Sequence, residues 1–140
     1  MTDSFAPKKA RILLVQDDPV ILGLVSGTLR PEGHDIIVAN GPMEALSITR
    51  QEFQRIDLVV TRINIKPISG LEFAKRLVRR GIDVPMLFMS ASRSMVGVIG
   101  HSLGQSSVIE EPFTAAELRS SVKKCLSVHR RKSVPLTTEN

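Results

Sequence analysis

The chain has a single cysteine, Cys125, and contains neither tryptophan nor tyrosine. One thiol cannot form an internal disulfide and has no partners for a zinc site, so we expect Cys125 to be a small packing residue. Five phenylalanines are the only aromatic residues, which leaves little surface for stacking nucleic-acid bases. These shortages argue against a disulfide-rich or zinc-stabilised fold.

Long apolar segments are also missing. No run approaches the about 20 residues needed to span a bilayer, and the first residues, MTDSFAPKK, lack the apolar core of a signal peptide. We therefore expect a cytoplasmic protein that does not contact a membrane. The 140 residues are 42% hydrophobic and 24% charged, which is typical of one globular domain.

The net charge of +5 raises the question of nucleic-acid binding, because phosphate attraction requires clustered cations. The basic residues gather at two expected helix ends, namely Arg79, Arg80, Lys123, Lys124, Arg130, Arg131 and Lys132. Cations there are stabilised by the helix dipole, so we interpret them as solvated helix ends. A nucleic-acid adaptor that uses the C-terminal cluster is kept as an alternative function.

Short apolar runs alternate with stretches of helical periodicity, a pattern typical of an α/β fold with a parallel sheet. Strands are expected at residues 11–15, 35–39, 57–62, 84–90 and 108–109. The first helix should follow an Asp18 cap, and the last should open with the capping box of Thr114 and Glu117. Helical periodicity is carried by Ile21, Leu24, Val25, Thr28 and Leu29, which share one face, and by Leu71, Ala74, Leu77 and Val78. The residues expected to point mostly inward or to lie on a buried side are Ala45, Leu46, Ile48, Thr49, Leu118, Val122, Cys125 and Leu126.

Two regions are less regular. Gly97 and Gly100 interrupt the expected fourth helix, and each costs about 1 kcal/mol relative to alanine, so that helix should be short, displaced or mobile. The segment from about Arg130 contains Pro135 and is expected to be frayed. We divide the chain into an extension (1–9), one domain (10–128) and a basic, polar tail (129–140). Because we see no second domain, we expect a stand-alone adaptor.

Ligands of open parallel sheets bind beyond the carboxyl ends of the strands, which directs attention to the residues there. From about Arg11 to Leu126, the motifs ILLVQDDP, IDLVVTRI followed by SGLEF, VPMLFMSAS and EEPFTAAEL occur in this order. Together they resemble the receiver domain of response regulators in two-component signalling. This resemblance implies a doubly wound domain, with a five-stranded parallel sheet in the order 2-1-3-4-5 and helices on both faces.

The resemblance also implies the residues of a phosphorylation site. The acidic pair of the family falls on Gln16 and Asp17, and the phosphorylated aspartate falls on Arg62. The hydroxyl position falls on Ser90, the lysine position on Glu111 and the switch aromatic on Val108. The bond between Glu111 and Pro112 is expected to be cis, as in the family. The chain therefore resembles a degenerate receiver that has lost the phospho-acceptor.

These replacements have chemical consequences. A guanidinium has only donors and stays protonated, so Arg62 cannot accept a phosphoryl group as aspartate does. Asp17, Glu111 and Arg62 together carry a charge of −1, against −2 for the family's three carboxylates and lysine, so Mg²⁺ binding should be weak or absent, with Asp17 a poor candidate ligand. We expect a reversed ion pair of Arg62 with Glu111, and Asp17 as a second carboxylate. The alternative is that these are drifted surface charges worth about 0–1 kcal/mol.

Other polar residues are assigned structural roles. Asp57 should lie at the opposite end of the sheet, where it cannot replace the acceptor. Ser90 is expected to form hydrogen bonds inside the site, without a catalytic role. The isolated histidines His34, His101 and His129 show no ligand spacing and should be exposed or capping residues.

The function that follows is a signalling module that is not an enzyme and needs no cofactor. We expect it to act without phosphorylation, by binding a sensor kinase or a downstream signalling protein through the face of the fourth helix, fifth strand and fifth helix. A homodimer is compatible with the same face. A phosphotransfer protein with an unconventional acceptor, Asp17 or Asp18, is the second alternative.

Overall fold

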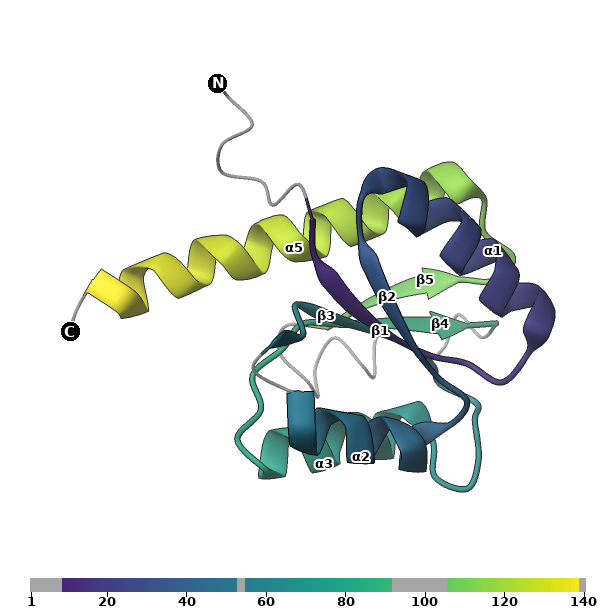
Figure 1. The fold of residues 1–140 in the computed structure, drawn as a ribbon, viewed down its shortest axis with the longest axis horizontal. Coiled ribbons are helices and arrows are strands. Elements are labelled where there is room, and N and C mark those ends of the chain that lie inside the picture. Colours follow the sequence, from purple (N-terminus) through teal and green to yellow (C-terminus); the bar gives the residue numbers. More distant parts are fainter. Residues whose placement is uncertain (1–8, 53–54, 92–105, 139–140) are drawn as a thin grey trace.

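A five-stranded parallel sheet forms the centre of the computed structural model, which describes residues 9–52, 55–91 and 106–138 (Figure 1). The strand order is β2-β1-β3-β4-β5, which confirms the α/β class and the order that the motifs imply. The strands are β1 (Arg11–Val15), β2 (Asp35–Ala39), β3 (Leu58–Arg62), β4 (Met86–Ser90) and β5 (Ser106–Glu110).

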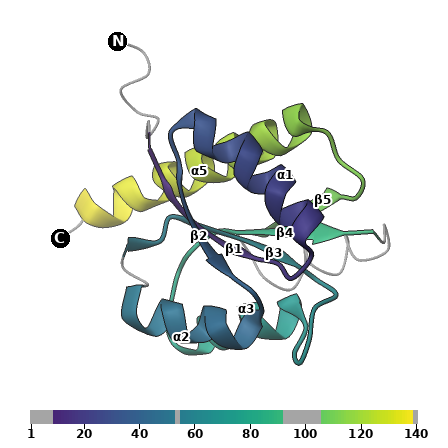
Figure 2. The ribbon, with the colours of Figure 1, turned by 45° about the vertical axis from the view of Figure 1, so that its right-hand side comes forward.

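Helices cover both faces of the sheet. Helices α1 (Pro19–Leu29) and α5 (Ala115–Thr138) lie on one face, and α2 (Pro42–Glu52) and α3 (Gly70–Arg79) lie on the other (Figures 1 and 2). A short 3-10 turn, η2 (Arg30–Glu32), follows α1. None of the helices in these described ranges has the length and apolar character needed to cross a membrane. The expected fourth helix, with Gly97, Gly100 and His101, lies outside the described residues.

Successive residues of β1 serve two separate cores. Leu13 and Val15 belong to the core under α2 and α3, whereas Ile12 and Leu14 belong to the core under α1 and α5. All four side chains are fully buried, because a parallel sheet covered on both faces leaves its central strands no solvent side. Such a strand is apolar throughout its length rather than at alternate positions.

The amino ends of the strands are held by polar contacts. Arg11 forms an ion pair with Asp35 at 3.2 Å, and its backbone N–H donates to Asp57 Oδ2 at 2.8 Å. Asp57 therefore lies at the end of the sheet opposite Arg62, as expected. His34 Nδ1 accepts a hydrogen bond from the Ala10 N–H at 3.2 Å, a local structural role.

The helix starts follow the sequence signals. Asp18 Oδ1 accepts from the Val20 N–H at 2.9 Å and so caps α1. Thr114 Oγ1 accepts from the Glu117 N–H at 3.0 Å, while Glu117 Oε1 accepts from the Thr114 N–H at 2.8 Å. Both predicted caps are confirmed, and the second is the reciprocal capping box of α5.

Two residues of the helical patterns lie outside the buried faces. Leu24 is 41% exposed and Val78 is 63% exposed, although both follow the period of the apolar residues beside them. In α3 the buried stripe runs through Gly70, Phe73, Ala74 and Leu77, so Val78 lies beyond its edge. Helical period defines which residues share a face, but contact with the sheet decides how wide the buried stripe is.

The C-terminal segment also differs from the expectation. Instead of fraying at about Arg130, α5 continues to Thr138 and extends past the sheet as the yellow end of the ribbon (Figure 1). Arg130, Arg131 and Lys132 are good helix formers, and each residue added to an existing helix gains one backbone hydrogen bond. The expectation of a frayed segment from about Arg130 was therefore wrong.

Protonation of His34 should lower the stability of the fold. Burial lowers the pKa of His34 below its ordinary value of 6.5, with Glu32 and Asp57 partly opposing that shift. A histidine with a depressed folded-state pKa contributes stability above the unfolded pKa and loses it as the pH falls through that range. We expect the urea midpoint to drop between about pH 7.5 and pH 5.5, where histidine titrates. His34→Gln should flatten this dependence, and an unchanged slope would contradict the assignment.

Candidate functional site

The carboxyl ends of four neighbouring strands bring the sequence-predicted residues to one edge of the sheet. Gln16 follows β1 and Arg62 ends β3, while Ser90 ends β4 and Glu111 follows β5. The ladder continues past the last strand residue, because the Glu111 N–H donates to the Ser90 carbonyl at 2.8 Å. Likewise the Gln16 N–H donates to the Ala39 carbonyl at 3.1 Å. These backbone hydrogen bonds therefore fix the Cα positions from which the Gln16 and Glu111 side chains project.

Arg62 and Glu111 face each other in this site. Arg62 Nη2 lies 3.9 Å from Glu111 Oε1, and the two side chains are 30% and 15% exposed. The expected ion pair is thus present, at a separation too long for a hydrogen bond. The second oxygen, Glu111 Oε2, is buried and has no hydrogen-bond partner among the described residues. At this separation we assign the pair a contribution of about 0–1 kcal/mol.

The loop after β1 is organised by the Gln16 side chain. Gln16 is fully buried, and its Oε1 accepts from the backbone N–H groups of Asp17 at 3.2 Å and Asp18 at 3.1 Å. Its Nε2 is buried without a hydrogen-bond partner in the part of the chain that the structure describes. The amide therefore holds the entry to α1, a role that sequence reasoning missed.

Asp17 does not take the place expected for it. Its side chain is exposed, and within the described residues no ion pair joins it to Arg62. The expectation of a second carboxylate on the guanidinium is therefore wrong. The physical reason is local, because the Gln16 amide binds the backbone of this loop and leaves Asp17 in solvent.

Ser90 and Val108 occupy structural positions. Ser90 is 3% exposed, and its carbonyl accepts the backbone hydrogen bond that positions Glu111. Val108 is partly buried and packs against the core under α2 and α3.

The bond between Glu111 and Pro112 is cis, as expected, and a second cis bond that the sequence did not signal precedes Pro67.

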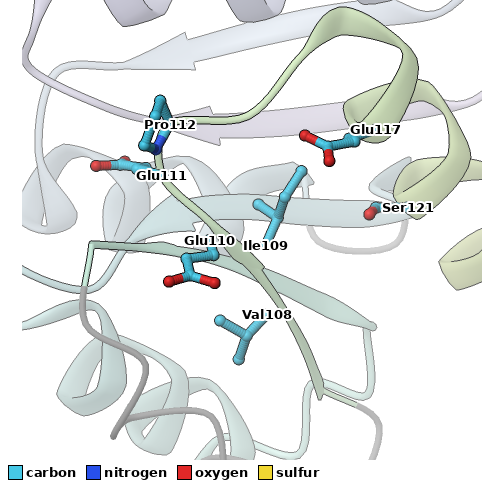
Figure 3. A pocket seen from close by; sticks show the side chains of 7 residues that line it. All are labelled: Val108, Ile109, Glu110, Glu111, Pro112, Glu117 and Ser121. Atoms are coloured by element: carbon cyan, nitrogen blue, oxygen red, sulfur yellow. The ribbon is translucent and has the colours of Figure 1, made fainter.

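An open pocket of about 380 Å³ lies beside Glu111, between β5 and the start of α5 (Figure 3). Figure 3 shows the Glu111 carboxylate directed away from Glu117. The lining residues are Val108, Ile109, Glu110, Glu111, Pro112, Glu117 and Ser121. Three carboxylates and two branched apolar side chains thus border one hollow at the edge of the sheet.

A close backbone approach positions Arg62 itself. A Cβ atom on Gly70 would lie 2.2 Å from the Arg62 carbonyl oxygen, so only glycine fits at the first residue of α3. The Gly70 N–H donates to the Ile63 carbonyl at 2.9 Å, and Ser69 Oγ caps the helix by accepting from the Glu72 N–H at 3.0 Å. The glycine of the SGLEF motif is the signal that could have revealed this contact.

The described residues contain no group of three or more His, Cys, Asp or Glu side chains that could hold a metal ion. Cys125 lies away from the site, on the buried side of α5, and burial raises the pKa of its thiol. A thiol of raised pKa stays protonated and unreactive at neutral pH. Its expected packing role is confirmed.

The fold and this edge define a receiver domain. The family model described as response regulator receiver domain matches residues 12–123, so the chain belongs to this family of two-component signalling proteins. It is a signalling module of the chemotaxis-regulator fold. The solved structure of the chemotaxis response regulator CheY4 of Vibrio cholerae superimposes with a TM-score of 0.77 at 25% identity, covering 84% of this chain and 99% of that one.

Similar curated proteins are transcriptional regulators. The chain is 32% identical over 134 residues to the alkaline phosphatase synthesis transcriptional regulatory protein SphR of Synechococcus elongatus, covering 90% of this chain and 51% of SphR. It is 30% identical over 117 residues to the corresponding protein PhoP of Bacillus subtilis, covering 83% of this chain and 48% of PhoP. The chain thus spans about half the length of these relatives.

Adding a methyl group at Gly70 should destabilise the domain. Gly70→Ala forces the start of α3 away from the Arg62 carbonyl, and overpacking of this kind costs about 1–3 kcal/mol of unfolding free energy. Gly27→Ala is the matched control, because a Cβ there meets nothing within 4 Å. The control should gain about 0.5–1 kcal/mol from helix propensity. Urea denaturation of both variants checks the opposite signs.

The coupling between Arg62 and Glu111 should be measurable but small. A double-mutant cycle with Arg62→Gln, Glu111→Gln and the double variant should give a coupling free energy of about 0–1 kcal/mol, decreasing with salt. Unfolding free energies at low and high ionic strength supply the values. A coupling of several kcal/mol would instead indicate a tight buried pair and contradict the long separation.

Proposed function

We propose that this chain is a receiver domain that signals through protein contacts without aspartyl phosphorylation. The observation that carries the proposal is the position of Arg62, which ends β3 inside the strand-end site. Acyl phosphate formation requires a carboxylate oxygen as nucleophile, and a guanidinium offers only donors. The chemistry of the family cannot proceed at this residue.

The pairing of Arg62 with Glu111 supports the same conclusion. By the resemblance, these positions carry an aspartate and a lysine in the family, so the signs of both charges are exchanged here. The guanidinium and carboxylate lie 3.9 Å apart. The positively charged guanidinium of Arg62 therefore lies where, by the resemblance, the phosphoryl group of the family would be bound. We infer that the site keeps one state rather than switching between two.

The residues present do not fit the Mg²⁺ ion that phosphorylating receivers require. Magnesium prefers carboxylate oxygens in an octahedral arrangement. Gln16 contributes a neutral amide whose oxygen already accepts two backbone hydrogen bonds, and Asp17 is exposed. Glu111 is the remaining carboxylate, and it lies beside the guanidinium of Arg62. We therefore propose no metal-dependent step.

We propose that the partner is a sensor kinase or a downstream signalling protein. The binding face would comprise β5 and the first turns of α5. On β5, Val108 takes the position of the switch aromatic, which removes the side chain that reports phosphorylation in the family. The relatives SphR and PhoP are transcriptional regulatory proteins, which supports control of transcription as the downstream process. A homodimer through this face is compatible with the proposal.

Acetyl phosphate should not modify the wild-type chain. After incubation with acetyl phosphate and Mg²⁺, intact-mass spectrometry should show no added phosphoryl group on wild type or on Arg62→Asn. The variant Gln16→Asp/Arg62→Asp/Glu111→Lys restores the family's residues and should acquire one hydroxylamine-sensitive adduct. It serves as the positive control for reagent and fold.

A stoichiometric adduct on the wild-type chain would remove the proposal. The variants Asp17→Asn and Asp18→Asn would then show whether one of these two carboxylates is the unconventional acceptor. Capture of partners from the native cell by wild type and by Arg62→Asp completes the test. Equal capture of the same protein would mean that the residue at position 62 does not control partner binding.

A further inference from the structure

Three polar side chains at the carboxyl edge of the sheet have unused hydrogen-bonding groups. Gln16 is fully buried, and its Nε2 has no hydrogen-bond partner among the described residues. The same holds for Glu111 Oε2. The Arg62 side chain is 30% exposed, lies 3.9 Å from Glu111 and forms no hydrogen bond within the described part of the chain. Buried polar groups of folded proteins are satisfied by partners, so these three indicate a site that a bound molecule completes.

The strand register makes Gln16 and Arg62 neighbours on one face of the sheet. Val15 is paired with Thr61 in the ladder of β1 and β3, and Gln16 and Arg62 are the next positions. Val15 belongs to the core under α2 and α3, so Gln16 points to the other face, which α1 and α5 cover. Adjacent strands lie about 4.8 Å apart. The amide and the guanidinium therefore project side by side.

Glu111 points to the same face from the other side of β4. Ile109 belongs to the core under α1 and α5, and Glu111 follows it at the next position of that face. Arg62 reaches this carboxylate across the end of β4, which lies between β3 and β5 in the sheet. Ser90 follows Phe88 of the opposite core and so points away from the pair. The donors of the site thus come from β1 and β3, and its acceptor follows β5.

The charges of these side chains select the chemistry of the bound molecule. A simple anion would be attracted by Arg62 but repelled by Glu111, and a simple cation would meet the reverse. A molecule that carries both a carboxylate and an ammonium group satisfies both side chains. Its carboxylate would accept from Arg62 and from Gln16 Nε2, because a guanidinium binds carboxylates through charge-assisted hydrogen bonds. Its ammonium group would donate to Glu111.

We infer that this edge of the sheet binds a small α-amino acid in its zwitterionic form. The two charged groups of an α-amino acid are attached to the same carbon atom, so one molecule can contact Arg62 and Glu111 together. Solvent reaches the pair at the partly exposed Arg62 and through the open hollow of about 380 Å³ beside Glu111 (Figure 3). The assignment of this ligand rests on the proposed function, because it takes the strand-end site to be free of phosphoryl chemistry.

Amide NMR spectra of the isotope-labelled full chain, titrated with glycine at neutral pH and constant ionic strength, test the site. A ligand of this size makes few contacts, so we expect a dissociation constant of about 0.1–10 mM. Saturable shifts should appear at the Gln16 side-chain amide and at the backbone N–H groups of Asp17 and Asp18, which bond to it. Acetate and methylammonium each carry only one of the two charged groups and should bind at least about tenfold more weakly.

Three exchanges between an acid and its amide test the residues without changing side-chain shape. Glu111→Gln removes the charge that binds the ammonium group. Gln16→Glu replaces the unused donor by an acceptor and keeps an oxygen for the loop. Each should raise the dissociation constant for glycine at least about tenfold. Glu117→Gln is the matched control, because glutamine retains the capping box of α5, and should leave glycine binding unchanged. The amide spectrum of each variant verifies that the fold is retained.

Glycine that produces no saturable shift, or acetate that binds as tightly as glycine, would overturn the inference. Binding that survives Glu111→Gln, or that is lost in Glu117→Gln, would do the same. The reaction with acetyl phosphate separates this failure from that of the proposed function. A chain that neither binds glycine nor acquires a phosphoryl group loses the ligand and keeps the proposed function, whereas a phosphoryl adduct on the wild-type chain removes both.

Discussion

The contact between the start of α3 and the end of β3 determines the geometry of the whole site. Gly70 lies against the Arg62 carbonyl so closely that no side chain fits between them. This packing fixes the backbone from which the guanidinium projects, and the hydrogen bond from Glu111 N–H to the Ser90 carbonyl fixes the opposing carboxylate. Two rigid backbone positions thus hold the charges near each other, although their direct attraction is weak. The scaffold, rather than the ion pair, maintains the arrangement.

Most of the fold could be predicted because its signals are local. β1 and β2 have the predicted bounds, and the caps at Asp18 and Thr114 are present, since each depends on a few adjacent residues. The errors concern long-range packing. Leu24 and Val78 obey the helical period but lie outside the contact with the sheet, and α5 continues beyond Arg130 although Pro135 led us to expect a frayed end. The sequence therefore predicts which face of a helix is buried more readily than it predicts how wide the buried face is.

The candidate site was predictable in its membership and less so in its detail. Parallel strands necessarily bring Arg62 and Glu111 to one edge, so their pairing follows from the strand assignments. The behaviour of Gln16 does not follow, because a flexible side chain can turn toward its own backbone as easily as toward its neighbours. Because the Gln16 side chain binds the backbone of this loop, Asp17 is exposed to solvent and does not join the ion pair of Arg62 with Glu111. Gly70 was visible in the motif, but its role requires knowing how closely two backbone segments approach.

The contacts at the amino ends of the strands have a further consequence for alignment. Because β1 is apolar on both faces, a slip by one residue would exchange its side chains between two cores without exposing them to water. Burial alone therefore gives little penalty against misregistration. Arg11 supplies that penalty by bonding to Asp35 on one neighbouring strand and to Asp57 on the other side. These polar contacts at the amino ends of the strands favour one register of β1 against its neighbours. The same register sets the positions of the carboxyl ends of the strands, where Arg62 and Glu111 meet.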